Sequence, residues 1–317
     1  MLRTLLIYLS QANWARKMVT QWRFTRAAAS RFVAGDTLKE ALSATMQLNA
    51  KGFWGTLDLL GENVDNREGA IASAEAYSAV LHALENENIK AGISLKLTQL
   101  GLGFDYDLCQ ENLIHILEVA SACNNFVRID MEESALLENT LRIFKRVRAM
   151  GNQNVGVVIQ SYLKRSEQDV LDLLDIGANI RMVKGAYREP ANIAYSRKRD
   201  VDANFDLLVR HMIDYAALNS SSPGDGKIPP TTVIATHDEK RIIIARDHAR
   251  ELGLTKSQLE FQFLYGIRPN LQVKMANAGY PVRIYIPYGT QWYPYFVRRL
   301  AERPANLWFF LSNLVRR

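Results

Sequence analysis

Hydrogen-bonding and charged side chains stand at or just after the ends of short apolar runs along most of the chain. These positions are Lys96, Asp130, Gln160, Lys184, Thr236, His237, Tyr265 and Tyr285. One polar residue at the end of a strand is usually a cap or a solvated residue. If the runs are parallel strands of one closed sheet, however, their ends meet at one rim, which is where such folds carry their functional sites. We therefore expect a functional site at this rim.

The cations of the expected rim favour an acidic ligand. They are Lys96, Arg181, Lys184, Arg298 and Arg299, and Asp130 is the obvious anion. Arg181 precedes Val183 by two positions on one predicted strand, so it should point into the mouth of the barrel. Because an unpaired buried cation is costly, Arg181 needs an anion or a polar cofactor. A carboxylate, a phosphate or both would meet that need.

Several other kinds of site are disfavoured by the motifs. No set of His, Asp or Glu has the spacing of metal ligands, so we expect no metal. The chain has no GxxxxGK[ST] loop, and Gly101–Leu102–Gly103 lacks the rest of a GxGxxG fingerprint. Any nucleotide must therefore be bound without the glycine-rich loop of a Rossmann fold. Arg197–Lys198–Arg199 has no interleaved aromatics, so we expect a solvated face and no nucleic-acid partner.

The elements that would position these residues follow a regular alternation of strands and helices. The predicted strands are residues 53–60, 93–97, 126–130, 155–160, 179–184, 232–236, 259–264 and 282–286, and the predicted helices are residues 68–87, 107–122, 133–150, 167–176, 196–218, 239–252, 270–278 and 293–303. Eight such units favour an α/β fold with a closed (β/α)8 TIM-like barrel over an open doubly wound sheet. Residues 220–230, SSSPGDGKIPP, are predicted to form a surface loop inside one unit.

The positive charge is concentrated at the start of the chain. Lysine and arginine exceed aspartate and glutamate by 39 to 33, and residues 1–35 hold six cations and no acid. Leucines 2, 5, 6 and 9 have the spacing of one apolar helix face. Three interpretations remain open: a peripheral contact with an anionic membrane, a helix packed on the body, and a mitochondrial transit peptide. We expect residues 1–50 to be a basic helical arm, with a capping box at Thr37 and Glu40, and residues 51–317 to be the barrel.

The cysteines and the first residues suggest a cytoplasmic protein, peripheral at the inner face of the membrane if the arm binds there. Cys109 and Cys123 lie about 21 Å apart along one predicted helix, so they cannot pair and are expected to be free buried thiols. The apolar start is too short for a signal-peptide core.

Arg298 and Arg299 point about 100° apart on a helix. Either one is buried and the other solvated, or the helix lies across or end-on to the barrel mouth.

Several motifs in order resemble the flavin-dependent proline dehydrogenases, above all the bacterial single-function form and the corresponding domain of the bifunctional proline-utilisation enzyme. They are SLKL at 94–97, RIDME at 128–132, VVIQSY at 157–162, RMVKGAY at 181–187, ATHDEK at 235–240, FQFLYG at 261–266 and RIYIPYGTQWYPYFVRRLAERPAN at 283–306. The resemblance spans about residues 50–310. It implies a distorted (β/α)8 barrel that holds FAD and oxidises L-proline to Δ1-pyrroline-5-carboxylate, with electrons passed to a membrane quinone.

The resemblance also implies roles for individual residues. Lys96, Arg298 and Arg299 would hold the substrate carboxylate, and Tyr285 and Leu264 would pack on the proline ring. Asp130 and Arg181 would be the catalytic pair, with Arg181 near the flavin N5. The cofactor would be lined by Met131, Gln160, Lys184, Gly185, Ala186, Thr236 and His237, with Glu302 near the cofactor or its gate. Two alternatives of other classes stay open: a Schiff-base aldolase using Lys184, and a non-catalytic surface-binding protein using the basic arm.

Overall fold

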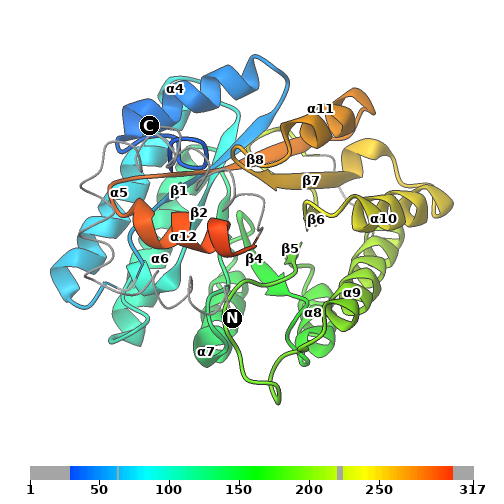
Figure 1. Cartoon of the computed structure of the whole chain (residues 1–317). Coiled ribbons are helices and arrows are strands. Elements are labelled where there is room, and N and C mark those ends of the chain that lie inside the picture. Colours follow the sequence, from blue (N-terminus) through cyan, green and yellow to red (C-terminus); the bar gives the residue numbers. More distant parts are fainter. Residues whose placement is uncertain (1–28, 63, 220–223, 303–317) are drawn as a thin grey trace, which may run out of the picture.

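Eight parallel strands close into a barrel in a computed structural model that describes residues 29–62, 64–219 and 224–302 (Figure 1). Each strand pairs with its neighbours in sequence, and the barrel closes where β1 pairs with β8. The strands are β1 (Trp54–Leu59), β2 (Ala91–Leu95), β3 (Val127–Ile129), β4 (Val155–Gln160), β5 (Asn179–Val183), β6 (Thr232–Ala235), β7 (Leu259–Leu264) and β8 (Val282–Tyr288). The predicted α/β class and closed (β/α)8 barrel are confirmed, and every predicted strand overlaps an observed one.

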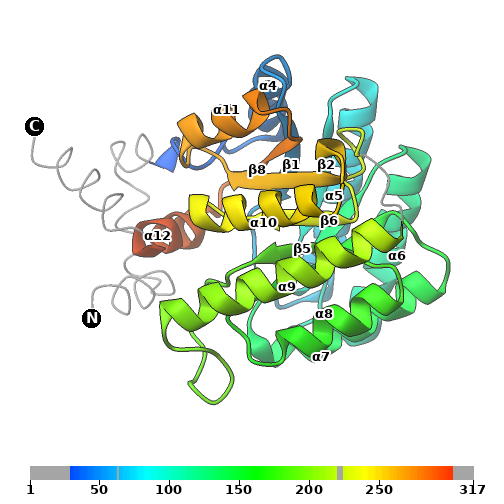
Figure 2. The same cartoon turned by 90° about the vertical axis from the view of Figure 1, so that its right-hand side faces the viewer.

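A helix follows each strand, α4 precedes the first one, and all of the helices except α12 lie outside the barrel (Figures 1 and 2). They are α4 (Leu38–Asn49), α5 (Arg67–Asn86), α6 (Tyr106–Ala122), α7 (Ser134–Ala149), α8 (Ser166–Asp175), α9 (Lys198–Leu218), α10 (Glu239–Glu251), α11 (Pro269–Asn277) and α12 (Trp292–Glu302), with short 3-10 turns η1 (Leu97–Gln99) and η2 (Lys256–Gln258). Within the described residues, no helix is long and apolar enough to cross a membrane.

The helix that precedes the barrel begins where the sequence predicts. Thr37 caps α4 by accepting a hydrogen bond from the backbone of Glu40, whose carboxylate accepts one from the backbone of Thr37. Ala41 and Leu42 of α4 belong to the main hydrophobic core, so this helix packs on the barrel. Residues 1–28, which carry most of the predicted basic arm, lie outside the described residues.

α12 covers the C-terminal end of the barrel, where it crosses in front of the strands in Figure 1 and lies at one end of them in Figure 2. Phe296 and Trp292 pack in a second apolar cluster with Phe32, with Leu60 after β1 and with Ile267 after β7. α12 therefore lies across the barrel mouth, which was one of the two predicted arrangements.

The interior of the barrel holds buried charges where branched apolar side chains are usual. Near the N-terminal end, Arg283 of β8 pairs with Glu260 of β7, with 2.8 Å between Nε and Oε1. Arg128 of β3 donates to the carbonyl of Asn179 at 2.7 Å and passes over Gly156 of β4. A Cβ at Gly156 would come within 2.4 Å of the Arg128 guanidinium, so only glycine fits there.

The predicted surface loop at 220–230 does more than connect two elements. Residues 220–223 lie outside the described part, but Gly226 is buried and its carbonyl accepts a hydrogen bond from Arg283 Nη1 at 2.9 Å. The described part of the loop therefore folds against the N-terminal end of the barrel.

The cysteines agree with the prediction, because Cys109 and Cys123 are free and buried.

Candidate active site

Asp130, which follows β3, is the centre of a buried polar cluster at the C-terminal end of the barrel. Its Oδ1 accepts hydrogen bonds from Ser94 Oγ of β2 at 2.7 Å and from Arg181 Nη2 of β5. Its Oδ2 accepts from Tyr285 OH of β8 at 2.7 Å and from Lys96 Nζ at 3.3 Å. Although burial alone would raise the pKa of Asp130, Arg181 and Lys96 hold it below the usual value. Asp130 is therefore an ionised carboxylate shared by two cations.

Arg181 reaches across the interior of the barrel. β5 and β2 are not neighbours in the sheet, yet Arg181 Nη2 lies 3.1 Å from Ser94 Oγ. The side chain therefore points inward, as the alternation along the strand predicts. Its Nη1 donates to Gln262 Oε1 of β7 at 3.3 Å, and its guanidinium carbon lies 5.3 Å from the ring centre of Tyr285. In the part of the chain that the structure describes, Asp130 is the one carboxylate that pairs with Arg181.

Lys96 sits among three carboxylates just beyond β2. Its Nζ lies 3.1 Å from Asp58 Oδ1 of β1, 3.3 Å from Asp130 Oδ2 and 3.9 Å from Glu62 Oε1. Burial alone would lower the pKa of Lys96. The carboxylates of Asp58, Asp130 and Glu62 and the Tyr285 hydroxyl raise this pKa well above its usual value. The ammonium group is therefore charged at neutral pH.

Glu62, in the loop after β1, joins α12 to this cluster. Arg298 Nη2 and Nη1 donate to the two carboxylate oxygens of Glu62 at 2.6 and 3.1 Å, a bidentate pair. Burial opposes ionisation of Glu62, but Arg298 and Lys96 lower its pKa. Arg299 is also half-buried, and its guanidinium carbon lies 5.0 Å from the ring centre of Tyr295. The alternative with one solvated arginine is therefore wrong, because both are half-buried at the mouth.

Tyr285 and Leu264 lie on the same side of the barrel as the arginines. Tyr285 is on β8 beside Asp130 and Lys96, and Leu264 is the last residue of β7. Both are partly buried against the apolar cluster under α12. The structure thus brings together all seven residues predicted to be catalytic or substrate-binding at one end of the barrel.

Lys184 is already neutralised by its neighbours. Its Nζ lies 2.6 Å from Asp202 Oδ1 of α9 and 2.7 Å from Asp238 Oδ2 before α10. Lys184 is one of the five cations expected at the rim, and these two carboxylates supply its counter-charge. A Schiff-base role also loses support, because the amine is already engaged in ion pairs with two carboxylates.

Four more predicted cofactor residues lie at or just after the C-terminal ends of β3, β4 and β6. Gln160, at the end of β4, donates through Nε2 to the carbonyl of Met131 at 3.3 Å. Its Oε1 is buried and has no hydrogen-bond partner among the described residues. Thr236, after β6, accepts from the backbone of Asp238 at 3.2 Å, and Nε2 of His237 accepts from the backbone of Leu264 at 3.4 Å.

The segment after β5 depends on one glycine. Gly185 has φ of +102°, and a Cβ there would come within 2.2 Å of the Tyr162 ring, so a side chain is excluded. Ala186 follows it and is half-buried. Glu302 is the last residue of α12, and its side chain lies outside the described part of the structure.

Five further polar residues in or beside this cluster were missed by the sequence analysis: Asp58, Glu62, Ser94, Gln262 and Glu132. Asp58 carried a usable signal, because it is the one charged residue in the apolar run 53–60. Glu62 carried none, since its partner Arg298 is 236 positions away. Glu132 Oε2 accepts from Thr98 Oγ1 at 2.7 Å, and burial raises its pKa to about 7.

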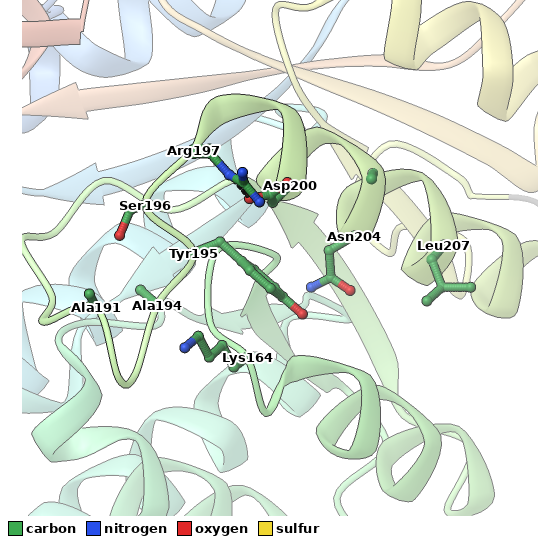
Figure 3. A pocket seen from close by; sticks show the side chains of 10 residues that line it. Lys164, Ala191, Ala194, Tyr195, Ser196, Arg197, Asp200, Asn204 and Leu207 are labelled. Carbon is green, nitrogen blue, oxygen red and sulfur yellow. Dashed lines mark hydrogen bonds and ion pairs between the residues drawn. The ribbon is translucent and has the colours of Figure 1, made fainter.

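A separate cavity of about 690 Å³ lies outside the barrel, between the loop before α8 and the first turns of α9 (Figure 3). Its walls include Lys164, Tyr195, Arg197 and Asn204, and none of the predicted site residues lines it. Arg197 pairs with Asp200 at 2.7 Å and is largely exposed, as expected of a solvated charged face. The polar cluster at the barrel mouth is therefore the candidate active site.

The comparisons of this chain with known proteins agree on one family. A family profile described as proline dehydrogenase (Pro_dh) matches residues 41–311. The chain is 36% identical over 315 residues to "Proline dehydrogenase 2" of Bacillus subtilis, covering 99% of both chains. It is 40% identical over 293 residues to "Proline dehydrogenase" of Deinococcus radiodurans, covering 91% of this chain and 90% of that one.

Among solved structures, the chain resembles proline utilization A (PutA) from Bdellovibrio bacteriovorus inactivated by N-propargylglycine, with a TM-score of 0.78 and 24% identity. The match covers 88% of this chain and 33% of that one, so it supports the fold. The family profile and the near-complete relatives, taken with a barrel mouth in which Lys96 and Arg181 meet on Asp130, place this chain in the proline dehydrogenase family.

Proposed function

We propose that this protein is a flavoenzyme that oxidises L-proline to Δ1-pyrroline-5-carboxylate with FAD as cofactor and a quinone as electron acceptor. Proline is a small zwitterion, so a site for it needs cations for the carboxylate and an apolar wall for the ring. The observation that carries the proposal is the buried cluster in which Lys96, Arg181 and Tyr285 meet on Asp130, with two more arginines above it on α12.

The substrate carboxylate would be bound by Lys96, Arg298 and Arg299. Arg298 is held over the mouth by Glu62, which also lies 3.9 Å from Lys96. An ammonium and two guanidinium groups on fixed elements can orient a carboxylate, and with it the carbon that loses hydride. Tyr285 and Leu264 would contact the ring from β8 and β7. Because Lys96 and Asp130 are both ionised, they hold a fixed field around the substrate.

The residues around the mouth fit a flavin. Gln160 has a buried acceptor oxygen without a partner among the described residues, which a ligand N–H would satisfy. Met131, Lys184, Gly185, Ala186, Thr236 and His237 would line the cofactor with it, and Glu302 would lie near it. FAD, when bound, accepts the hydride. Arg181 supplies a buried positive charge at the same end of the barrel, which would favour the anionic reduced form of a flavin.

The basic arm supports a further proposal about the electron acceptor. A membrane quinone is reached at the bilayer surface, and residues 1–35 carry six cations and no acid. Such a segment is attracted to anionic lipid headgroups. We place the protein in the cytoplasm, with peripheral contact at the inner face of the membrane through this arm.

An anaerobic visible spectrum of the purified protein tests the proposal directly. We expect a flavin absorption band that bleaches on addition of L-proline and is unchanged by D-proline. A flavin band that ignores L-proline would overturn the substrate and keep the cofactor. A protein that shows no flavin band, even after addition of FAD, would overturn the cofactor.

A further inference from the structure

One buried amide joins β1 and β2 where their backbones stop pairing. The ladder between these strands runs from Gly55 paired with Ala91 to Asp58 paired with Ser94. Beyond it, Gln99 Oε1 accepts a hydrogen bond from the backbone of Lys96 at 3.0 Å. Gln99 Nε2 donates to the backbone carbonyl of Leu59 at 2.6 Å.

The side-chain amide of Gln99 takes the place of one peptide hydrogen bond of the ladder. A primary amide offers the same donor and acceptor as a peptide group, so it satisfies both strands while standing between them. The two backbones are therefore held apart by the width of an amide. Asp58 is the last residue of β1 in this ladder and Lys96 lies just beyond the end of β2, and their side chains form the 3.1 Å ion pair of the site.

The orientation of this amide is fixed by its surroundings. Gln99 is 1% exposed and closes the turn η1, which begins directly after Lys96. The backbone N–H of Lys96 can only donate and the carbonyl of Leu59 can only accept, so the Gln99 oxygen must face Lys96 and its nitrogen must face Leu59. Tyr77 OH of α5 lies 2.9 Å from Gln99 Oε1 and 3.3 Å from the Leu59 carbonyl oxygen. Glu132 holds the middle of the same turn through both its oxygens on Thr98.

We propose that Gln99 is a positioning residue that places the Lys96 ammonium group for the substrate carboxylate. Gln99 would act through the backbone of Lys96 and would not touch the substrate. The role rests on the proposed oxidation of proline, whereas the bridge itself does not. Loss of the bridge should let the ends of β1 and β2 move, and weaken ground-state and transition-state binding of the carboxylate alike.

Two substitutions separate positioning from stability. Gln99→Leu keeps most of the volume and removes the bridge at every pH. Gln99→Glu keeps the bridge when the new carboxyl is protonated, because its O–H donates to Leu59, and loses it on ionisation. The charged and titratable groups around that position are Tyr77, Lys96, Asp58 and Glu132.

Asn125 offers a matched control at the opposite end of the barrel. Its Nδ2 donates to the carbonyl of Ala91, where β2 begins, at 3.0 Å, and its Oδ1 accepts from the backbone of Phe126 at 2.7 Å. It is also 1% exposed. Asn125→Leu and Asn125→Asp therefore make the same chemical changes to an equally buried amide, which contacts β2 at its other end.

Steady-state kinetics of the FAD-loaded variants give the first measurement. For Gln99→Leu we expect KM for L-proline to rise about tenfold with kcat changed much less, as for loss of a buried hydrogen-bonded bridge. For Gln99→Glu the ratio of its KM to the wild-type KM should rise with pH by a similar factor. Both Asn125 variants should keep wild-type KM and pH dependence. Equal effects at the two positions, or a Gln99→Glu profile parallel to wild type, would overturn the positioning role.

Hydrogen exchange gives a second measurement that needs no turnover. The backbone N–H of Lys96 should exchange faster in Gln99→Leu than in wild type, and should be unchanged in Asn125→Leu. An unchanged Lys96 would overturn the bridge itself. If wild type fails to oxidise proline while Lys96 is protected by Gln99, the proposed function falls and the bridge stands.

Discussion

Replacing Asp130 by asparagine should cost more stability than replacing Arg181 by methionine, although both substitutions break the Arg181–Asp130 ion pair. Asp130 has two cationic partners, Arg181 and Lys96, whereas Arg181 pairs with one carboxylate among the described residues. In Asp130→Asn, Lys96 keeps Asp58, but Arg181 is left with the neutral Ser94 and Gln262. In Arg181→Met, the Asp130 carboxylate still has an ammonium partner.

The magnitudes follow from what each substitution leaves behind. A buried charge that loses its partner costs about 3–5 kcal/mol, which we expect for Asp130→Asn. Arg181→Met removes hydrogen bonds and leaves no unpaired charge, so about 1–3 kcal/mol is expected. The double variant should be more stable than Asp130→Asn alone, because methionine removes the stranded cation.

Urea unfolding followed by tryptophan fluorescence measures these differences. All variants should be compared at one fixed FAD concentration, because bound cofactor adds its own stabilisation. Arg181→Asn is a useful control, since it is also neutral but smaller, and should rank with methionine. The reasoning is refuted if adding Arg181→Met to Asp130→Asn lowers stability further, or if Arg181→Met alone costs more than Asp130→Asn.

Three other predictions concern the rim, the mouth and the arm. Burial raises the pKa of Glu132 from 4.5 to about 7, so the folded protein keeps a proton that the unfolded chain loses, and stability falls as pH rises through this window. Glu132→Gln should therefore gain up to about 3 kcal/mol over wild type between pH 4.5 and 7.5 in urea unfolding, and a pH-independent difference would contradict this. Arg299→Met should lose about 2–5 kcal/mol of transition-state binding, measured as a fall in kcat/KM for L-proline. A near-normal kcat/KM would contradict a role of Arg299 in binding the carboxylate. Deleting residues 1–28, which stops before the packed Ala29, should preserve turnover with a soluble acceptor but weaken sedimentation with anionic liposomes, and equal sedimentation would remove the membrane contact.

The barrel could be predicted from the sequence because its signals are local. Each strand is a short apolar run followed by an amphipathic helix, and the alternation alone gives the topology. The ends of strands were less certain. β2 begins at Ala91, before the β-branched residue that marks it in the sequence, and ends at Leu95, where Gln99 takes over the pairing.

The site was predictable where strand position determines the direction of a side chain, as it does for Arg181 and Asp130. It was not predictable where the partner comes from a distant loop. The residues next to Lys184 in the sequence do not indicate that Asp202 and Asp238 neutralise it, and those next to Arg298 do not indicate a pair with Glu62. Charge counting along a chain finds cations, but pairing between elements decides which of them need a ligand.

The crossing of Arg128 over Gly156 has a consequence for how this barrel can diverge. A side chain at position 156 would collide with the Arg128 guanidinium group and also with the backbone carbonyl oxygen of Asn179, which would lie 2.6 Å from a Cβ there. Replacing Arg128 would remove only the first of these two collisions. Among descendants of this chain, glycine should therefore persist at position 156 even where position 128 has changed.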